Sequence, residues 1–163
     1  MSKKFILLGI VALGLFAAFK LTPLVGGLTP SNKASAQTLS PNVVSVYKTE
    51  SCGCCSKWVD HLQEKGFEVK VETRQSLGAV RAKYGVPDQL ASCHTAHVDG
   101  YTIEGHVPAK DIRRLLTERP VATGLSVPGM TVGSPGMEMD GRSDPYEVIL
   151  FGPETGSIFA SYP

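Results

Sequence analysis

The chain has 163 residues, of which 19% are charged, and its formal net charge is +1. A chain of this length suits one small domain with a single hydrophobic core. After position 36 the chain carries 12 basic and 15 acidic residues, a net charge of −3 (12 − 15). This balance excludes the strongly basic surface that is typical of nucleic-acid-binding proteins.

The first 36 residues have the pattern of an export signal. Two lysines precede an uncharged apolar run from Phe5 to Phe19, and Ala34-Ser35-Ala36 offers a small-residue cleavage site. The alternative is an uncleaved membrane anchor, but the run is short for a membrane span, which needs about 20 residues. We therefore predict a cleaved signal peptide over 1–36, a linker over 37–42 and a single domain over 43–163.

Three of the four cysteines lie within four positions, Cys52-Gly53-Cys54-Cys55, and the fourth is Cys93. Three thiols this close cannot all pair with one another, and a bond between the adjacent Cys54 and Cys55 would be strained. Two structural disulfides therefore explain the cluster poorly in the oxidising compartment that export implies. A soft-metal site or a redox site explains it better, and the C-x-x-C of Cys52 and Cys55 keeps a thiol–disulfide oxidoreductase as an alternative.

The cysteine cluster lies between a predicted strand and a predicted helix. Residues 43–47 form a β-branched, nearly all-apolar run that is typical of a buried strand. In the helix that follows, Cys55, Trp58, Val59 and Leu62 share one apolar face, and Gly66 ends it. The unpaired N–H groups at the start of a helix lower a thiol pKa, which favours both metal binding and disulfide exchange.

A strand at 67–72 and a short helix at 77–84 follow, and then a β-hairpin over 93–107 with Asp99-Gly100 as its two-residue turn. Pairing Val98 with Tyr101 places Cys93 opposite His106, close enough for the two side chains to share a ligand or a proton. The alternation predicts one polar and one apolar face for the hairpin. We expect a functional role for His106, whereas we interpret the other three histidines as structural (His94, His97) or as solvated surface (His61).

A third helix begins at Pro108 and ends at Arg119-Pro120. The segment 124–141 is too rich in Gly and Pro for a helix or strand, and it carries Met130, Met137 and Met139. A closing β-hairpin is predicted from 146–151 and 157–162. The resulting α/β order of strand, helix, strand, helix, hairpin and helix resembles a thioredoxin-like fold, and this resemblance brings Cys93 beside the cysteine cluster.

Thiolates and thioethers are soft ligands, and Cu(I) selects both, whereas zinc has little use for thioethers. Four cysteines with three nearby methionines (Met130, Met137 and Met139) therefore favour copper, although the methionines could simply fill gaps under a loop. A zinc-stabilised interaction module is a third, weaker hypothesis.

Several spaced motifs from Val43 to the C-terminus resemble the CopG-type family, a family catalogued as a metal-binding domain of unknown function. They include Cys52-Gly53-Cys54-Cys55, Ser92-Cys93-His94-Thr95-Ala96, Glu104-Gly105-His106-Val107-Pro108-Ala109, Val127-Pro128-Gly129-Met130 and Gly133-Ser134-Pro135-Gly136-Met137-Glu138.

The resemblance implies a periplasmic copper-resistance protein of Gram-negative bacteria with a thioredoxin-like fold. It implies that Cys52, Cys54, Cys55 and Cys93 bind Cu(I), as one ion or as a multinuclear cluster, and that the copper cycles between oxidation states. His106, Met130 and Met137 are further candidate ligands. Expected partners are copper ions and other periplasmic copper-resistance proteins, with the chain as a monomer and with membrane contact only through an uncleaved signal.

Overall fold

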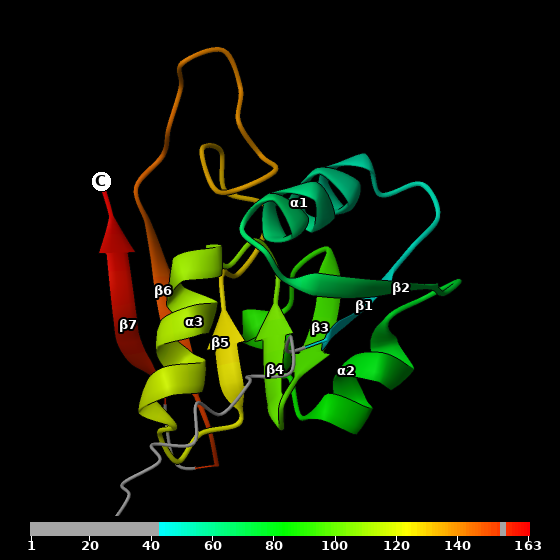
Figure 1. Ribbon diagram of the computed structural model, residues 1–163, viewed down its shortest axis with the longest axis vertical. Coiled ribbons are helices and arrows are strands. Elements are labelled where there is room, and N and C mark those ends of the chain that lie inside the picture. Colours follow the sequence, from blue (N-terminus) through cyan, green and yellow to red (C-terminus); the bar gives the residue numbers. More distant parts are fainter. Residues whose placement is uncertain (1–42, 154–155) are drawn as a thin grey trace, which may run out of the picture. The chain divides into compact units, whose positions relative to one another are not determined.

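A computed structural model describes residues 43–153 and 156–163 of the chain (Figure 1). The predicted signal peptide (1–36) and linker (37–42) lie outside the described residues. Within the described part of the chain, no helix has the length and apolar character that crossing a membrane requires.

The described residues form a mixed α/β structure with one sheet of seven strands, in the order β2-β1-β3-β4-β5-β6-β7. Neighbouring strands are antiparallel except for the parallel pairs β1–β2 and β4–β5. The elements along the chain are β1 (Val43–Lys48), α1 (Gly53–Glu64), β2 (Glu68–Thr73), α2 (Gly78–Tyr84), the short 3-10 helix η1 (Asp88–Leu90), β3 (His94–Val98), β4 (Tyr101–Glu104), α3 (Ala109–Glu118), β5 (Gly124–Ser126), β6 (Tyr146–Phe151) and β7 (Ser157–Tyr162).

The helices cover both faces of the sheet. Successive residues of a strand point to opposite faces, so Val46 and Tyr47 of β1 mark the two sides. Val46 belongs to the larger buried cluster with side chains of α1 and α3, such as Leu62 and Ile112. Tyr47 belongs to a smaller cluster with Val80 of α2. Helices α1 and α3 therefore pack on one face and α2 on the other (Figure 1).

The predicted face of α1 is confirmed, because its buried residues are Cys55, Trp58, Val59 and Leu62. Trp58 is fully buried and its indole N–H donates to the carbonyl of Val107 at 2.9 Å. This face fixes the rotation of α1 about its own axis. The cysteines at the start of α1 are thereby held beside the residue that precedes β3, with Cys55 Sγ 3.5 Å from the carbonyl oxygen of Cys93.

The predicted register between β3 and β4 is confirmed, with Val98 opposite Tyr101 and Thr95 opposite Glu104. The polar face of this pair is nevertheless buried, because α2 covers it. The carboxylate of Glu104 is fully buried and accepts from Arg81 Nε at 2.9 Å, from Ser92 N at 2.7 Å and from Thr95 Oγ1 at 2.6 Å. The bond to Ser92 fixes the backbone immediately before Cys93.

The prediction that 124–141 contains no strand is wrong for its first three residues, which form β5 beside β4. A Cβ on Gly124 would lie 1.7 Å from the carbonyl oxygen of Thr102, so only glycine fits where these strands meet. Glycine counts against a strand in sequence reasoning, but here it is what allows the pairing. The two segments at the C-terminus, 146–151 and 157–162, form the antiparallel pair β6 and β7.

Candidate functional site

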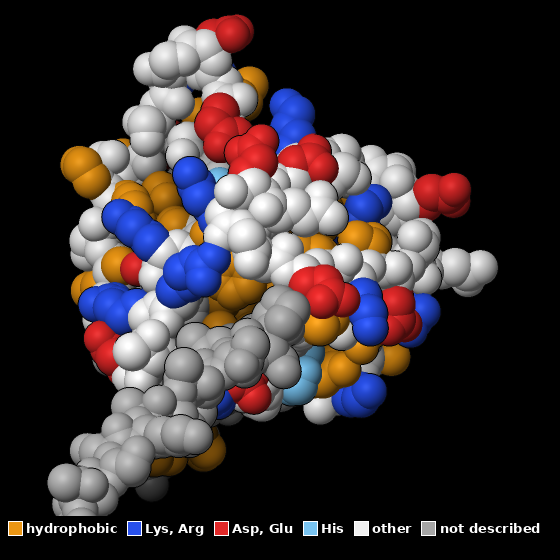
Figure 2. Space-filling view, in the orientation of Figure 1, with side chains coloured by type: hydrophobic (Ala, Val, Ile, Leu, Met, Phe, Trp, Pro, Cys, Tyr) orange, Lys and Arg blue, Asp and Glu red, His pale blue; other side chains and the backbone are white. Residues whose placement is uncertain are grey.

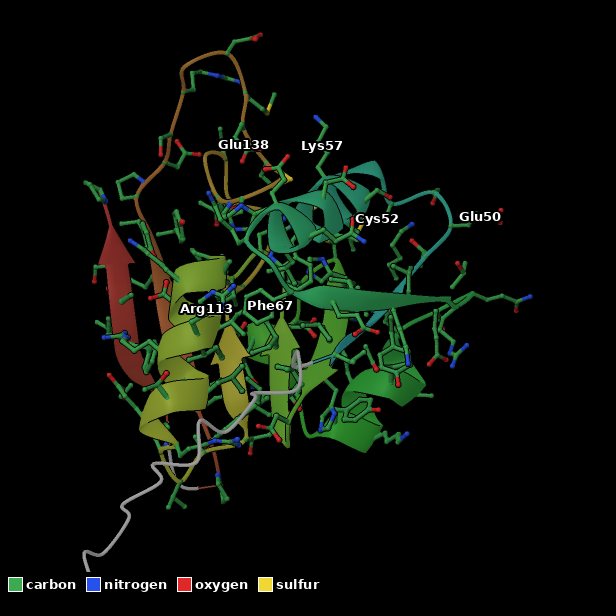
Figure 3. The ribbon with its side chains drawn as sticks, in the orientation of Figure 1. Glu50, Cys52, Lys57, Phe67, Arg113 and Glu138 are labelled. Carbon is green, nitrogen blue, oxygen red and sulfur yellow. A yellow bond between two sulfur atoms is a disulfide. The ribbon has the colours of Figure 1, made fainter. Side chains whose placement is uncertain are left out.

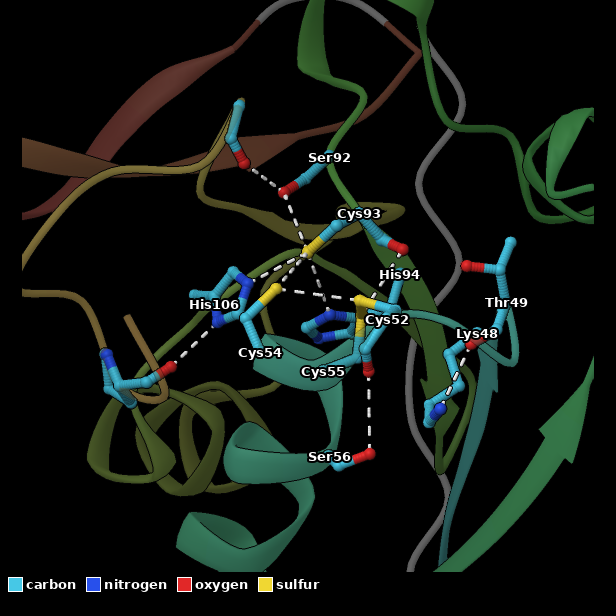
Figure 4. Close-up of a disulfide and its surroundings, with 12 residues drawn as sticks. Lys48, Thr49, Cys52, Cys54, Cys55, Ser56, Ser92, Cys93, His94 and His106 are labelled. Carbon is cyan, nitrogen blue, oxygen red and sulfur yellow. Dashed lines mark hydrogen bonds between the residues drawn. A yellow bond between two sulfur atoms is a disulfide. The ribbon is translucent and has the colours of Figure 1, made fainter. Parts of the chain in front are cut away.

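The four cysteines gather where the start of α1 meets the start of β3 (Figure 4). Cys52 is the N-cap residue of α1, and Cys54 and Cys55 lie in its first turn. Cys93 immediately precedes β3. Figure 3 shows Cys52 at the end of α1 that faces the loop from β1.

The sulfur atoms are in two chemical states. Cys52 and Cys55 form a disulfide, whereas Cys54 and Cys93 are free thiols. The Sγ atom of Cys54 lies 3.6 Å from that of Cys52 and 3.9 Å from that of Cys93. All four sulfur atoms lie within 4.8 Å of one another. The structure thus brings together the four cysteines that the sequence analysis singled out.

These separations suit a metal ion held by thiolates. Two sulfur ligands at about 2.3 Å from one tetrahedral ion lie about 3.8 Å apart. The distances from Cys54 to its two sulfur neighbours, 3.6 and 3.9 Å, bracket this value. The disulfide occupies two of the four sulfurs, so a four-thiolate site requires its reduction.

Cys93 has two histidine neighbours, with His106 Nε2 at 2.9 Å and His94 Nδ1 at 3.5 Å from its sulfur. Burial, and after it the neighbouring Cys54, raises the pKa of the Cys93 thiol to about 12. Without a cation the thiol is therefore neutral at pH 7. A bound metal ion favours the thiolate and offsets the cost of burying its charge.

The hydrogen bonds of His106 determine its tautomer. Its Nδ1 lies 2.8 Å from the carbonyl oxygen of Pro135, which can only accept, so Nδ1 carries the proton. Burial lowers the pKa of His106, which keeps the ring neutral and leaves a lone pair on Nε2 facing Cys93. Metal-binding histidines typically donate their other ring N–H to a carbonyl in this way. The predicted proximity of Cys93 and His106 is confirmed.

His94 lies beside the thiols, which the sequence reasoning missed. Its ring is fully buried, with its centroid 4.2 Å from that of Trp58, and its Nε2 has no hydrogen-bond partner among the described residues. Cys93, His94 and His106 offer three ligand atoms within 4.8 Å of one another. Strand alternation assigned His94 and Cys93 to opposite faces of the hairpin, but Cys93 lies before the first residue of β3. The sequence signal that could have indicated this neighbour is that His94 directly follows Cys93 in the chain.

The two remaining histidines lie away from the sulfurs. His97 stacks on Tyr84 with ring centroids 4.9 Å apart, and its structural role stays a prediction. The prediction that His61 is solvated surface is wrong, because the side chain is partly buried and its Nε2 accepts from the backbone N–H of Ala109 at 3.2 Å. Helix α3 begins at Ala109, so His61 satisfies one of its otherwise unpaired N–H groups.

The segment 127–137 reaches the site through backbone atoms. Gly129 contributes a carbonyl to Ser92 Oγ, and Pro135 contributes one to His106. Met130 is 64% exposed and Met137 is partly buried. A thioether contribution from Met130 or Met137 stays a prediction.

Gly136 allows this segment to pack closely against the start of α1. Its φ is +84°, and a Cβ there would lie 2.7 Å from Trp58 N and 2.9 Å from the carbonyl oxygen of Cys54. Gly141 has a similar φ of +72°, but nothing lies within 4 Å of its Cβ position. The two glycines form a matched pair, because alanine strains both backbones but clashes at only one.

We expect Gly136→Ala to lower the free energy of unfolding by about 1–3 kcal/mol more than Gly141→Ala does, since only the former forces packed atoms apart. Urea unfolding of both variants in the same redox state measures the difference. The Gly136→Ala change should also shift the ring nitrogen resonances of His106, whose partner is the adjacent Pro135. Equal unfolding midpoints would show that the segment does not rest on α1.

The chain is similar to known proteins over the residues that form this site. A family model described as "Protein of unknown function, DUF411" matches residues 90–137, which include Cys93 and His106. Two solved structures, "Copper resistance protein copG- Form 2" and "Copper resistance protein copG- Form 1", are each 44% identical to this chain with a TM-score of 0.72. The matches cover 76% of this chain and 99% and 98% of those chains, respectively. A comparison with curated protein sequences gives no match.

Proposed function

Since this chain belongs to the copG family of copper resistance proteins, we propose that it binds Cu(I) through Cys52, Cys54, Cys55 and Cys93 and acts in copper resistance. The observation that carries this proposal is the convergence of four sulfur atoms within 4.8 Å, one of which is 38 residues from the nearest other cysteine (93 − 55). Thiolates are soft donors, and Cu(I) is the first-row ion that selects them most strongly.

The neighbouring imidazole rings support the same assignment. His106 presents an unprotonated Nε2 toward Cys93, and His94 places Nδ1 near the same sulfur. Neutral imidazole adds ligand atoms without adding the negative charge that further thiolates would bring. Together with the three sulfurs of the α1 turn, the ligand atoms of Cys93, His94 and His106 can hold one ion or a multinuclear cluster.

We further propose that the Cys52–Cys55 disulfide exchanges electrons with bound copper. Oxidation of two Cu(I) ions to Cu(II) releases two electrons. Reduction of one disulfide consumes two electrons and two protons, and it yields two thiols. The disulfide lies 3.6 Å from the Cys54 sulfur, so both redox couples lie within one site. The protein would then convert copper between oxidation states as well as hold it.

The same proposal includes the cellular context that the sequence predicts. A disulfide supports an oxidising compartment, for which the periplasm is our proposal. The strand order β2-β1-β3-β4, with α1 and α3 on one face and α2 on the other, supports a thioredoxin-like fold. We propose a monomer that exchanges copper ions with other periplasmic copper-resistance proteins.

The test is a Cu(I) titration of protein that has been reduced, desalted and kept without oxygen, in the presence of the chromophoric Cu(I) chelator bicinchoninate. We expect the protein to withdraw at least one equivalent of Cu(I) from the chelator. Failure to compete would reject Cu(I) binding. Retention of Zn(II) against excess Cu(I) would instead support a zinc-stabilised interaction module.

A second candidate function is thiol–disulfide exchange with exported proteins. Cys55 is fully buried, whereas Cys52 is partly exposed at the N-cap of α1. This asymmetry suits attack by a partner thiolate on Cys52, with Cys55 as the leaving group. In the reverse direction, the reduced Cys52 thiolate attacks a partner disulfide and Cys55 then resolves the mixed disulfide. Reduction of insulin disulfides by reduced, metal-free protein with dithiothreitol as electron source, faster than with dithiothreitol alone and lost in Cys52→Ser, would favour this function over copper binding alone.

A further inference from the structure

A cavity of about 460 Å³ lies between α1, α3 and the segment 133–138. We call it the α1–α3 pocket. None of the cysteines lines it, and its volume falls within the range of about 300–1,000 Å³ that is common for small-molecule sites. It shares one residue with the thiol site, since Pro135 lines the pocket while its carbonyl accepts from His106.

The pocket has an apolar, aromatic wall. Tyr146 and Tyr162 line it, and their rings stack with centroids 4.5 Å apart and planes 4° from parallel. Pro108 and Pro135 add aliphatic surface. The hydroxyl of Tyr162 donates to the buried carboxylate of Asp111, and this hydrogen bond fixes the orientation of the ring. Because each ring covers one face of the other, the pair offers ring edges to a ligand, and a flat apolar group can pack against these edges and the two prolines.

The rim is positively charged, with Lys65, Lys110 and Arg113 among its lining residues. None of these three forms an ion pair within the described part of the chain. Lys110 Nζ lies 4.6 Å from the centroid of the Tyr162 ring, so its charge is held beside the aromatic wall. Figure 2 shows Lys and Arg side chains gathered around apolar atoms over α3, and Figure 3 labels Arg113 there.

Other charged or titratable groups at the pocket reduce the positive charge only in part. The carboxylate of Glu138 lines the cavity, and its Oε1 accepts from the N–H of Gly136 at 3.0 Å. His61 also lines it, but its Nε2 is already occupied by the N–H of Ala109. The guanidinium of Arg113 already donates to the carbonyl of Lys65 and lies over the ring of Phe67. Lys65 and Lys110 against the one lining carboxylate still leave an excess of positive charge, which favours a ligand with a single negative charge.

We propose that the α1–α3 pocket binds a small aromatic monocarboxylate, with its ring against the edges of the Tyr146 and Tyr162 rings and its carboxylate toward Lys65 and Lys110. Apolar walls with a few converging charged groups are what such a ligand requires. A second carboxylate on the ligand would be repelled by the carboxylate of Glu138, so we expect dicarboxylates to bind more weakly. No cysteine lines the pocket, so this proposal does not rest on copper binding.

The test uses the purified protein and three probes in amide-resolved NMR titrations: 3-phenylpropionate, its neutral analogue 3-phenylpropanamide, and acetate. We expect 3-phenylpropionate to shift the amides of Lys110 and Gly133 in a saturable manner and to leave the distant turn at Gly100 unchanged. The neutral analogue and acetate should each bind at least about tenfold more weakly, because each lacks one half of the recognition.

Two exposed lysines provide variants that leave the fold intact. The double variant Lys65→Gln/Lys110→Gln should weaken 3-phenylpropionate binding by about tenfold or more. Lys70→Gln, on the exposed edge strand β2, removes a lysine outside the pocket and should leave the affinity unchanged. Equal binding of the acid and its neutral analogue, or an unchanged affinity in the double variant, would overturn the proposal.

Discussion

Replacing Cys93 with serine is expected to weaken Cu(I) binding by at least about 100-fold, because losing even an outer partner of a metal ligand typically costs about 10- to 100-fold. Cys93 is the sulfur that comes from outside α1, 3.9 Å from Cys54 Sγ and 2.9 Å from His106 Nε2. Its loss removes a soft donor and leaves His106 without the group that it faces. A serine oxygen is a hard donor and does not replace the sulfur for Cu(I).

Competition with bicinchoninate on fully reduced protein measures this change. Ser51→Ala is the matched control. Ser51 is exposed and adjacent to Cys52, and its replacement leaves all four sulfur atoms in place. Urea unfolding of metal-free protein separates a binding defect from a folding defect. Wild-type affinity in Cys93→Ser would mean that the three cysteines of the α1 turn suffice, and the convergent four-sulfur site would be rejected.

Oxidation of Cys52 and Cys55 is expected to lower affinity for a soft ion by at least about 100-fold, if each lost thiolate costs at least about tenfold. The disulfide withdraws two of the four sulfurs and leaves the thiols of Cys54 and Cys93. Ag(I) is the suitable probe, because this soft ion carries no electron that it can readily donate to the disulfide. Anaerobic calorimetry of oxidised and reduced protein with Ag(I) measures the difference.

The double variant Cys52→Ser/Cys55→Ser is the matched control for this comparison. It lacks the same two sulfurs but cannot form the disulfide, so it should bind Ag(I) weakly before and after treatment with reductant. Wild-type protein should gain affinity on reduction, and the variant should not. Equal affinities of oxidised and reduced wild-type protein would exclude the disulfide as a control on metal binding.

Local patterns in the sequence were sufficient to predict several elements. The 3.6-residue spacing of apolar residues predicted the buried face of α1, and the Asp99-Gly100 turn predicted the register of β3 and β4. Both signals arise from neighbours in the chain, whose geometry the backbone itself constrains. The same register was enough to predict that Cys93 and His106 lie together.

Other features depend on packing between distant segments. Gly124 forms β5 only because its missing side chain lets it lie against Thr102. On the buried polar face of the β3–β4 pair, Glu104 has a charged partner because α2 brings Arg81 beside it. Neither contact leaves a periodic signal in the sequence, since each joins residues more than 20 positions apart.

The sequence by itself determined which atoms are available for chemistry: four thiols, three of them at the start of one helix, and a histidine opposite the fourth. Only the tertiary structure decided how they are used. It paired Cys52 with Cys55, left Cys54 and Cys93 free, and added His94 to the group. The physical reason is that separations of 3 to 4 Å between side chains depend on how α1, β3 and the segment after β5 pack together.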